Sequence, residues 1–276
     1  MRIAALVAVT AIWGWTFVVV KDAIAAYAVV PFLTLRFALA ALVLLPFARR
    51  LGRATWRAGA PIGAFLAAGY LLQTIGLART RASDTGLVTG SFVVITPLLD
   101  RLVFGVRPSR AAVAAVALAA AGLVLLVAGQ PVEIGVGDVI VAGGAIAFAA
   151  QIVALSRLSA RHDPVALTST QILIALAAFA ALSLALREPV LVPAPEVAVA
   201  VVITGVLATS LAFFIQTWAQ RHLAATPTAI VLATEPAWAT LFGIVLAGDA
   251  FSPLRALGAL LLLAAPLVAT LAAVRR

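Results

Sequence analysis

Long apolar runs separated by short polar segments fill the chain. Ten of these runs approach the roughly 20 helical residues that cross about 30 Å of hydrocarbon. Strands of a membrane β-barrel alternate apolar and polar positions over about ten residues, whereas these runs are continuously apolar and rich in Ala and Leu. The pattern predicts an all-α integral membrane protein with ten transmembrane helices at about 3–20, 31–48, 59–78, 84–104, 111–128, 137–156, 166–186, 196–218, 226–247 and 254–273.

One segment of the first half of the chain returns, in a looser form, in the second half. Residues 73–97 and 216–236 both contain Gln-Thr near a helix end, a basic polar turn, a Ser or Thr, an apolar run and a proline inside that run. Dividing the chain at the acidic linker near Glu133 places five spans in 1–133 and five in 134–276. Because an odd number of spans makes the second half enter the membrane from the opposite side, we expect two inverted repeats around a central cavity, as in many secondary transporters.

Arginines concentrate in alternate loops of this arrangement. If the amino terminus is cytoplasmic, the loops at 49–57, 101–110 and 157–161 face the cytoplasm and carry most of the Arg residues, while acids concentrate in the opposite loops. The positive-inside bias therefore predicts a cytoplasmic (inner) membrane protein with both termini in the cytoplasm and its basic loops against anionic lipid. The alternative is a signal peptide cleaved after AAYA at 25–28, but nine further spans follow this first one.

Composition agrees with a membrane protein and argues against several other classes. Hydrophobic residues make up 64% of the chain and charged residues 11%, against roughly 25% charged residues in a soluble domain. The net charge of +9 would indicate nucleic acid only on a soluble module with a basic face, which this pattern lacks. Cysteine is absent, and the two histidines, His162 and His222, lie beside arginines in predicted loops. We therefore expect no thiolate chemistry, no metal site and no cofactor.

Several motifs occur in an order that resembles a known family. They are WGWTFVVVK at 13–21, Pro31 followed by Arg36, the two Gln-to-Pro segments, and Asp249 before the last span. Together with the ten spans, they resemble the EamA family of the drug/metabolite transporter superfamily over nearly the whole chain. The resemblance implies two inverted five-helix halves and export of small metabolites, commonly amino acids, and the chain looks most like exporters of the YddG type. Family members often carry an acid before the fifth and tenth spans; Asp249 supplies the second, but Arg107 stands roughly where the first would fall.

Two charged residues inside predicted spans are candidates for substrate binding or coupling. Glu235 is the acid nearest to the centre of a span, where an ionised side chain costs at least about 2.5 kcal/mol on insertion scales. It either transfers a coupling proton or binds an ammonium group, or it stays protonated and bonds to the backbone freed by Pro236. Arg36 lies near the outer end of the second span, close enough to snorkel. It either binds a substrate carboxylate or pairs with Asp22 or another acid, and the structural role is the favoured one.

Aromatic and polar residues near the span centres could line the expected cavity. An indole N–H or a phenol needs a partner there, and amides and hydroxyls bind either a zwitterion or a neighbouring helix. Core packing is the competing interpretation for the aromatic residues. The candidate substrate-binding residues are Trp13, Trp15, Tyr70, Gln73, Ser91, Gln151, Ser210, Glu235 and Trp238, with Thr209, Thr234 and Gln216 as further polar candidates.

Prolines interrupt the fourth and the ninth predicted spans. Pro97 and Pro236 each remove a backbone donor inside an otherwise apolar helix. Either they act as gating hinges or they form static kinks.

A secondary transporter is the function class that these features favour. No phosphate loop of the form GxxxxGK[ST] is present, and no loop is long enough for an ATPase domain. A gradient must then drive transport, through protons or by facilitated diffusion. We expect amino acids as substrates, with cationic drugs or nucleosides as the alternative. A membrane-embedded enzyme needs a nucleophile with a base or a bound metal, and a channel needs a filter or a ring of charges; the spans offer neither.

Overall fold

The computed structural model describes residues 1–48, 51–128, 134–246 and 252–274, and within these ranges it contains helices and no strands. Asp249 and Glu133, on which the family resemblance and the division into halves drew, lie outside the described residues. The helices are α1 (Arg2–Ala26), α2 (Val29–Leu44), α3 (Arg53–Leu77), α4 (Ala82–Gly90), α5 (Phe92–Phe104), α6 (Arg110–Val127), α7 (Val136–Leu158), α8 (Pro164–Ala185), α9 (Pro195–Val202), α10 (Ala212–Gln220), α11 (Ala225–Leu232), α12 (Glu235–Leu246) and α13 (Pro253–Val274). A π-helical segment, Ile203–Leu211, joins α9 to α10, and short 3₁₀ turns follow α2 and α7.

Eight helical segments in the described ranges are long and apolar enough to cross a membrane. They confirm the prediction of a multi-pass, all-helical membrane protein, while the count of ten stays a prediction. The segments are Arg2–Ala26, Val29–Phe47, Arg53–Leu77, Ala82–Phe104, Arg110–Val127, Val136–Arg161, Pro164–Ala185 and Pro195–Gln220.

Most helix ends lie within a few residues of their predicted positions, and α1 is a clear exception. The first apolar run was expected to end before Lys21, but α1 continues to Ala26. The ammonium group of Lys21 donates to the carbonyl oxygens of Leu77 (2.6 Å) and Thr80 (2.7 Å), at the end of α3. Lys21 thus satisfies carbonyls that have no partner within their own helix, and its charge does not end α1.

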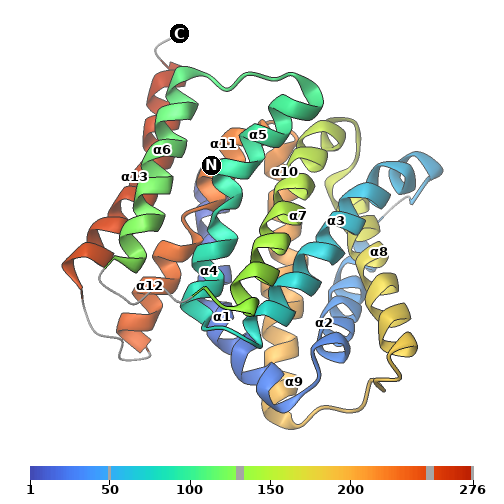
Figure 1. The fold of residues 1–276 in the computed structure, drawn as a ribbon. Coiled ribbons are helices and arrows are strands. Elements are labelled where there is room, and N and C mark those ends of the chain that lie inside the picture. Colours follow the sequence, from blue (N-terminus) through green and yellow to red (C-terminus); the bar gives the residue numbers. More distant parts are fainter. Residues whose placement is uncertain (49–50, 129–133, 247–251, 275–276) are drawn as a thin grey trace.

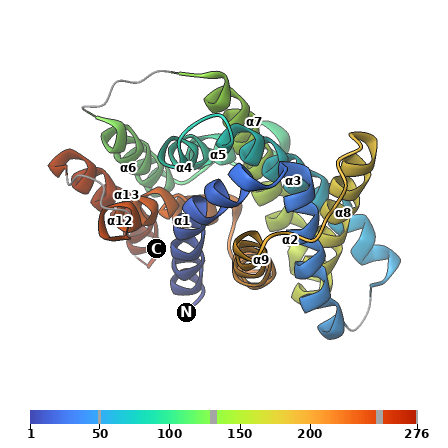
Figure 2. The ribbon, with the colours of Figure 1, turned by 90° about the horizontal axis from the view of Figure 1, so that it is seen from below.

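Helices from the two halves of the sequence pack against each other. The most extensive contacts join α3 with α7 and α8, α6 with α13, and α2 with α8. Figures 1 and 2 both place α6 and α13 at one end of the molecule and α2, α3 and α8 at the other, with α1 between them. Small residues permit the close approach: a Cβ on Gly122 of α6 would lie 2.8 Å from the carbonyl oxygen of Gly258 of α13.

Both predicted spans that contain a candidate hinge proline are interrupted. Only one of the two breaks lies at its proline. Pro236 has no N–H for the carbonyl of Leu232, and α11 ends at Leu232 before α12 begins at Glu235. In the fourth span the break lies at Ser91, whose hydroxyl donates to the Val88 carbonyl (2.6 Å), whereas Pro97 lies inside the continuous α5. The first break therefore follows from the local turn at Ser91.

Candidate functional site

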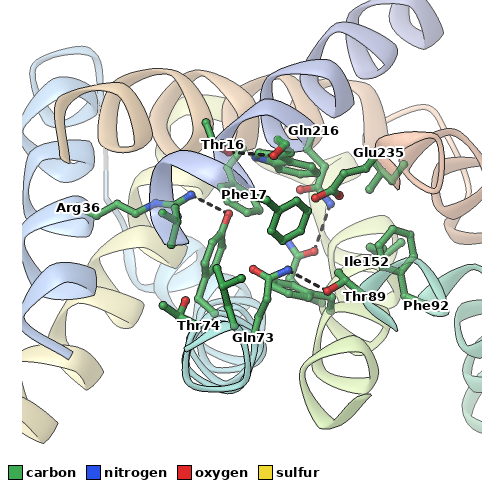
Figure 3. Close-up of a pocket in the computed structure, with 18 residues that line it drawn as sticks. Thr16, Phe17, Arg36, Gln73, Thr74, Thr89, Phe92, Ile152, Gln216 and Glu235 are labelled. Carbon is green, nitrogen blue, oxygen red and sulfur yellow. Dashed lines mark hydrogen bonds between the residues drawn. The ribbon is translucent and has the colours of Figure 1, made fainter. Parts of the chain in front are cut away.

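A cavity lies among the helices, with about 620 Å³ of space unoccupied by protein atoms, part of it open to solvent. Its wall comes from α1, α2, α3, α7 and α10 together with the two interrupted spans, α4–α5 and α11–α12 (Figure 3). Aromatic rings and polar groups share this wall. The lining residues are Trp13, Phe17, Tyr70, Phe92, Phe148 and Phe213; Thr16, Arg36, Gln73, Thr74, Thr89, Gln151, Gln216 and Glu235; and Val20, Leu77, Ile152 and Leu232.

Arg36 lies in the cavity wall with only 3% of its surface exposed, so the predicted snorkelling is wrong. The Nε atom donates to the Thr209 hydroxyl (2.8 Å), an Nη atom donates to the Tyr70 hydroxyl (3.1 Å), and the guanidinium carbon lies 4.5 Å from the centroid of the Tyr70 ring. All these partners are neutral, and across the described residues Arg36 has no ion pair with Asp22 or any other acid.

The π-helical segment supplies contacts to both α1 and α2. Wider turns of this kind occur often at functional sites. The Ala208 carbonyl accepts from the Trp13 indole N–H (2.8 Å), and the next residue, Thr209, accepts from Arg36. Ser210 donates to the carbonyls of Gly205 (2.8 Å) and Ala40 (3.2 Å), so its hydroxyl is bonded to backbone. The segment thus fixes one aromatic and one cationic member of the cavity wall.

Glu235 begins α12 directly after the break, and it is 6% exposed. Figure 3 shows it on the side of the cavity opposite to Arg36. Within the part of the chain that the structure describes, its carboxyl group makes no ion pair and no hydrogen bond. The predicted hydrogen bond to the backbone freed by Pro236 is therefore not formed. The cavity therefore holds one cation and one carboxyl group, neither of which is matched by an opposite charge.

Amide side chains connect the cavity wall to the helices behind it. Gln73 donates to the Thr89 hydroxyl (3.1 Å), which links α3 to α4. Gln216 of α10 donates to Gln151 of α7 (3.2 Å), and Gln151 donates to Gln171 of α8 (3.2 Å). These bonds hold the polar part of the wall in a defined geometry.

The structure brings some of the predicted site residues together and separates others. Trp13, Arg36, Tyr70, Gln73, Gln151, Gln216 and Glu235 lie in the cavity wall. Four other candidates lie outside it: Trp15, which is half-buried on α1; Ser91, at the break between α4 and α5; Ser210, in the π-helical segment; and Trp238, on α12. Thr209 lies behind Arg36, and Thr234 shares a hydrogen bond of 2.8 Å with Thr10.

Sequence reasoning missed several members of the site. Phe17, Phe148 and Phe213 have no polar atom that needs a partner, so nothing in their sequence setting distinguishes them from core residues. Asp100 was also missed: it is 3% exposed on α5 and forms an ion pair of 2.5 Å with Arg157 on α7. Among the described residues, no group of three or more His, Cys, Asp or Glu residues could hold a metal ion.

Comparisons with known proteins identify relatives over nearly the whole length. The model of the EamA-like transporter family matches residues 1–128 and 135–271. An uncharacterized transporter of Archaeoglobus fulgidus is 31% identical over 269 residues, which cover 96% of this chain and 84% of the relative. One crystal structure has a TM-score of 0.79 and 22% identity and covers 99% of this chain and 98% of its own; it indicates similarity of fold alone.

Proposed function

We propose that this chain, which belongs to the EamA-like transporter family, is a secondary transporter that exports small metabolites, above all amino acids, across the cytoplasmic membrane. The supporting observation is the central cavity, which presents a buried arginine and a buried carboxyl group on opposite sides, with aromatic rings between them (Figure 3). That transport is the activity follows from the family, whereas the substrate and the direction are our proposals.

The chemistry of the cavity suits a zwitterion with an apolar side chain. A guanidinium binds a carboxylate through two parallel N–H donors, and Arg36 uses only part of its donor set within the protein. A buried charge without a counter-charge is unfavourable, so a ligand with both charges would stabilise both walls. The rings of Phe17, Phe148 and Phe213 offer an apolar surface for the side chain.

For the architecture, we propose ten spans in two inverted repeats, 1–133 and 134–276, with both termini in the cytoplasm. The family model matches two stretches of similar length, 1–128 and 135–271, which supports a duplication. The ninth span would consist of α11 and α12, and the tenth of α13. The cavity would then lie between the halves near the bilayer midplane. The break at Ser91, in the same span as Pro97, and the break before Pro236 would serve as gating hinges.

Two forms of energy coupling and one other substrate class fit the same cavity. Protonation of Glu235 would couple export to a proton gradient, whereas a Glu235 that stays ionised would leave facilitated diffusion. Cationic drugs or nucleosides would use Glu235 and the aromatic rings but would leave Arg36 without a counter-charge. The buried arginine therefore favours amino acids.

Counterflow in proteoliposomes tests the proposal. Labelled leucine, phenylalanine and threonine are compared with nucleosides and cationic drugs, and we expect saturable flux of at least one amino acid. Glu235→Gln and Trp13→Ala should abolish that flux, while Arg101→Gln, at an exposed position on α5, should leave it unchanged. Flux confined to drugs or nucleosides would refute the substrate class, and single-channel currents would refute the carrier.

A further inference from the structure

Gln216 holds a buried hydrogen-bond acceptor that the protein leaves without a partner. Its side chain lies in the cavity wall, and the residue is 1% exposed. Its amide nitrogen donates to Oε1 of Gln151 (3.2 Å) and to Oε1 of Gln220 (2.9 Å), which uses both of its N–H groups. Its own Oε1 is buried and accepts no hydrogen bond from the described protein atoms.

The orientation of this amide is fixed by a backbone carbonyl one residue further along the network. The amide nitrogen of Gln220 donates to the carbonyl oxygen of Ile152 (2.9 Å), which can only accept. Gln220 must therefore present Oε1 to Gln216. If the Gln216 amide were flipped, its oxygen would face the oxygens of both Gln220 and Gln151, and two hydrogen bonds would become repulsive contacts.

Gln216 shares the cavity wall with a second acceptor, the carboxyl group of Glu235. Both residues line the cavity, and Figure 3 shows them on the side away from Arg36. An ionised carboxyl group only accepts, as does the free oxygen of Gln216. Nearly all buried acceptors in proteins have a partner, so this side of the cavity lacks a group with several N–H donors.

We propose that Gln216 Oε1 and the Glu235 carboxylate together form an ammonium subsite that selects substrates by their amino group and directs their carboxylate toward Arg36. This assignment rests on the proposed function and adds the recognition element and the orientation of the substrate. Gln151, Gln171 and Gln220 hold the Gln216 amide in place and act as positioning residues.

The test compares three compounds that share one side chain. Counterflow of the labelled amino acid that gives the largest saturable flux, among leucine, phenylalanine and threonine, is inhibited with that amino acid, with the acid that lacks its amino group, and with the amine that lacks its carboxylate. We expect the acid to inhibit at least about tenfold more weakly than the amino acid, because hydrogen bonds to a charged group are involved.

Gln216→Met removes the acceptor at similar volume. It should raise the KM for the amino acid about tenfold while leaving inhibition by the amino-free acid unchanged, so that the selectivity for the amino group falls. Thr228→Val is the control, because it removes a fully buried hydroxyl that donates to the Ala224 carbonyl, outside both the Gln216 network and the cavity wall, and it should leave the selectivity unchanged.

The possible outcomes separate the two proposals. Equal inhibition of the wild-type protein by the amino acid and by its amino-free acid would overturn the subsite while transport itself stands, and this measurement needs no variant to fold. An equal loss of affinity for both compounds in Gln216→Met would likewise reduce Gln216 to a structural role. Absence of saturable flux for all three amino acids would overturn the proposed substrate class and this subsite with it.

Discussion

Two buried charged regions of the molecule are built in opposite ways. Between α5 and α7, Asp100 and Arg157 lie 2.5 Å apart, and the Arg157 guanidinium also lies 4.7 Å from the ring of Phe104. In the central cavity, Arg36 and Glu235 are about as buried as Asp100. Within the described residues, Arg36 has only neutral hydrogen-bond partners and the Glu235 carboxyl group has none. The charges between α5 and α7 thus form an ion pair, whereas the two charged residues of the cavity do not.

This difference distinguishes charges that stabilise the fold, those of Asp100 and Arg157, from charges that we propose bind a ligand, those of Arg36 and Glu235. Desolvation of an ion costs several kcal/mol, and a close counter-ion or a set of hydrogen bonds offsets this cost. Asp100 has its counter-ion within the protein, and 37% of the Arg157 side chain is exposed, so water can hydrate its guanidinium. Arg36 and Glu235 line empty space instead, so we expect substitutions in the two regions to affect different properties.

Among the substitutions that compare the two regions, that of Arg36 should have the largest effect. Arg36→Gln removes the proposed cationic partner of a substrate carboxylate, and truncation of one side of a buried charge pair costs about 2–5 kcal/mol. We expect kcat/KM for amino-acid counterflow to fall about 100-fold. Arg36→Lys keeps the charge but loses the planar fork, and should give an intermediate value.

The contrast with Arg157 makes this prediction specific. Arg157→Gln should lower the stability of the protein in detergent and leave the KM of the inserted protein within about twofold. Wild-type kcat/KM in Arg36→Gln, at equal reconstitution, would mean that the cavity does not bind an anionic group.

The fold could be predicted from the sequence because hydrophobicity alone determines which segments span the membrane. The runs that predicted the spans reappear as helices with similar bounds, and Pro236 marked a real break. The other break was misplaced because Ser91 bonds to the carbonyl of its own helical turn. Such local bonds compete with regular helix geometry but have no hydropathy signal.

The site was less predictable because its geometry depends on contacts between distant segments. Arg36 was expected near the membrane surface, but Tyr70 on α3 and Thr209 in the π-helical segment hold it inside. The π-helical segment depends on tertiary packing, and no residue pattern in 203–211 predicted it. Similarly, the direction of the Gln216 amide depends on Ile152, which lies on another helix.

A second prediction concerns the position of Glu235. A Cβ on Gly14 of α1 would lie 2.8 Å from the backbone nitrogen of Ala239 and 2.9 Å from the carbonyl oxygen of Glu235. Gly14→Ala should therefore displace the start of α12 and with it the carboxyl group, and raise the KM about tenfold, since small misplacements at a site are costly. Gly86→Ala is the control, because its Cβ would meet only Phe17, at 3.4 Å. A similar KM for both alanine variants would contradict this account.

A third prediction concerns the matched pair. Asp100→Asn leaves Arg157 without its counter-ion, but the partial exposure of Arg157 limits the cost to about 1–3 kcal/mol, below the roughly 3–5 kcal/mol for a fully buried pair. We expect the apparent Tm in detergent to fall by several degrees, at roughly 2–4 °C per kcal/mol for a chain of this size. Substrate affinity and selectivity should not change. A change in selectivity without loss of stability would remove the distinction between the two regions.

The smallest expected effect concerns a neutral hydrogen bond of the cavity. Trp13→Phe keeps an aromatic ring near Phe213, now 5.4 Å from the Trp13 ring, but loses the bond from the indole N–H to the Ala208 carbonyl. Since a neutral hydrogen bond contributes about 1 kcal/mol, the KM should rise only about two- to fivefold. Trp15→Phe, on the same helix but outside the wall, should leave the KM unchanged. If Trp13→Phe instead reduced flux as strongly as Arg36→Gln, the indole hydrogen bond would contribute as much to substrate binding as the charge of Arg36. The unpaired charges would then not dominate recognition of the substrate.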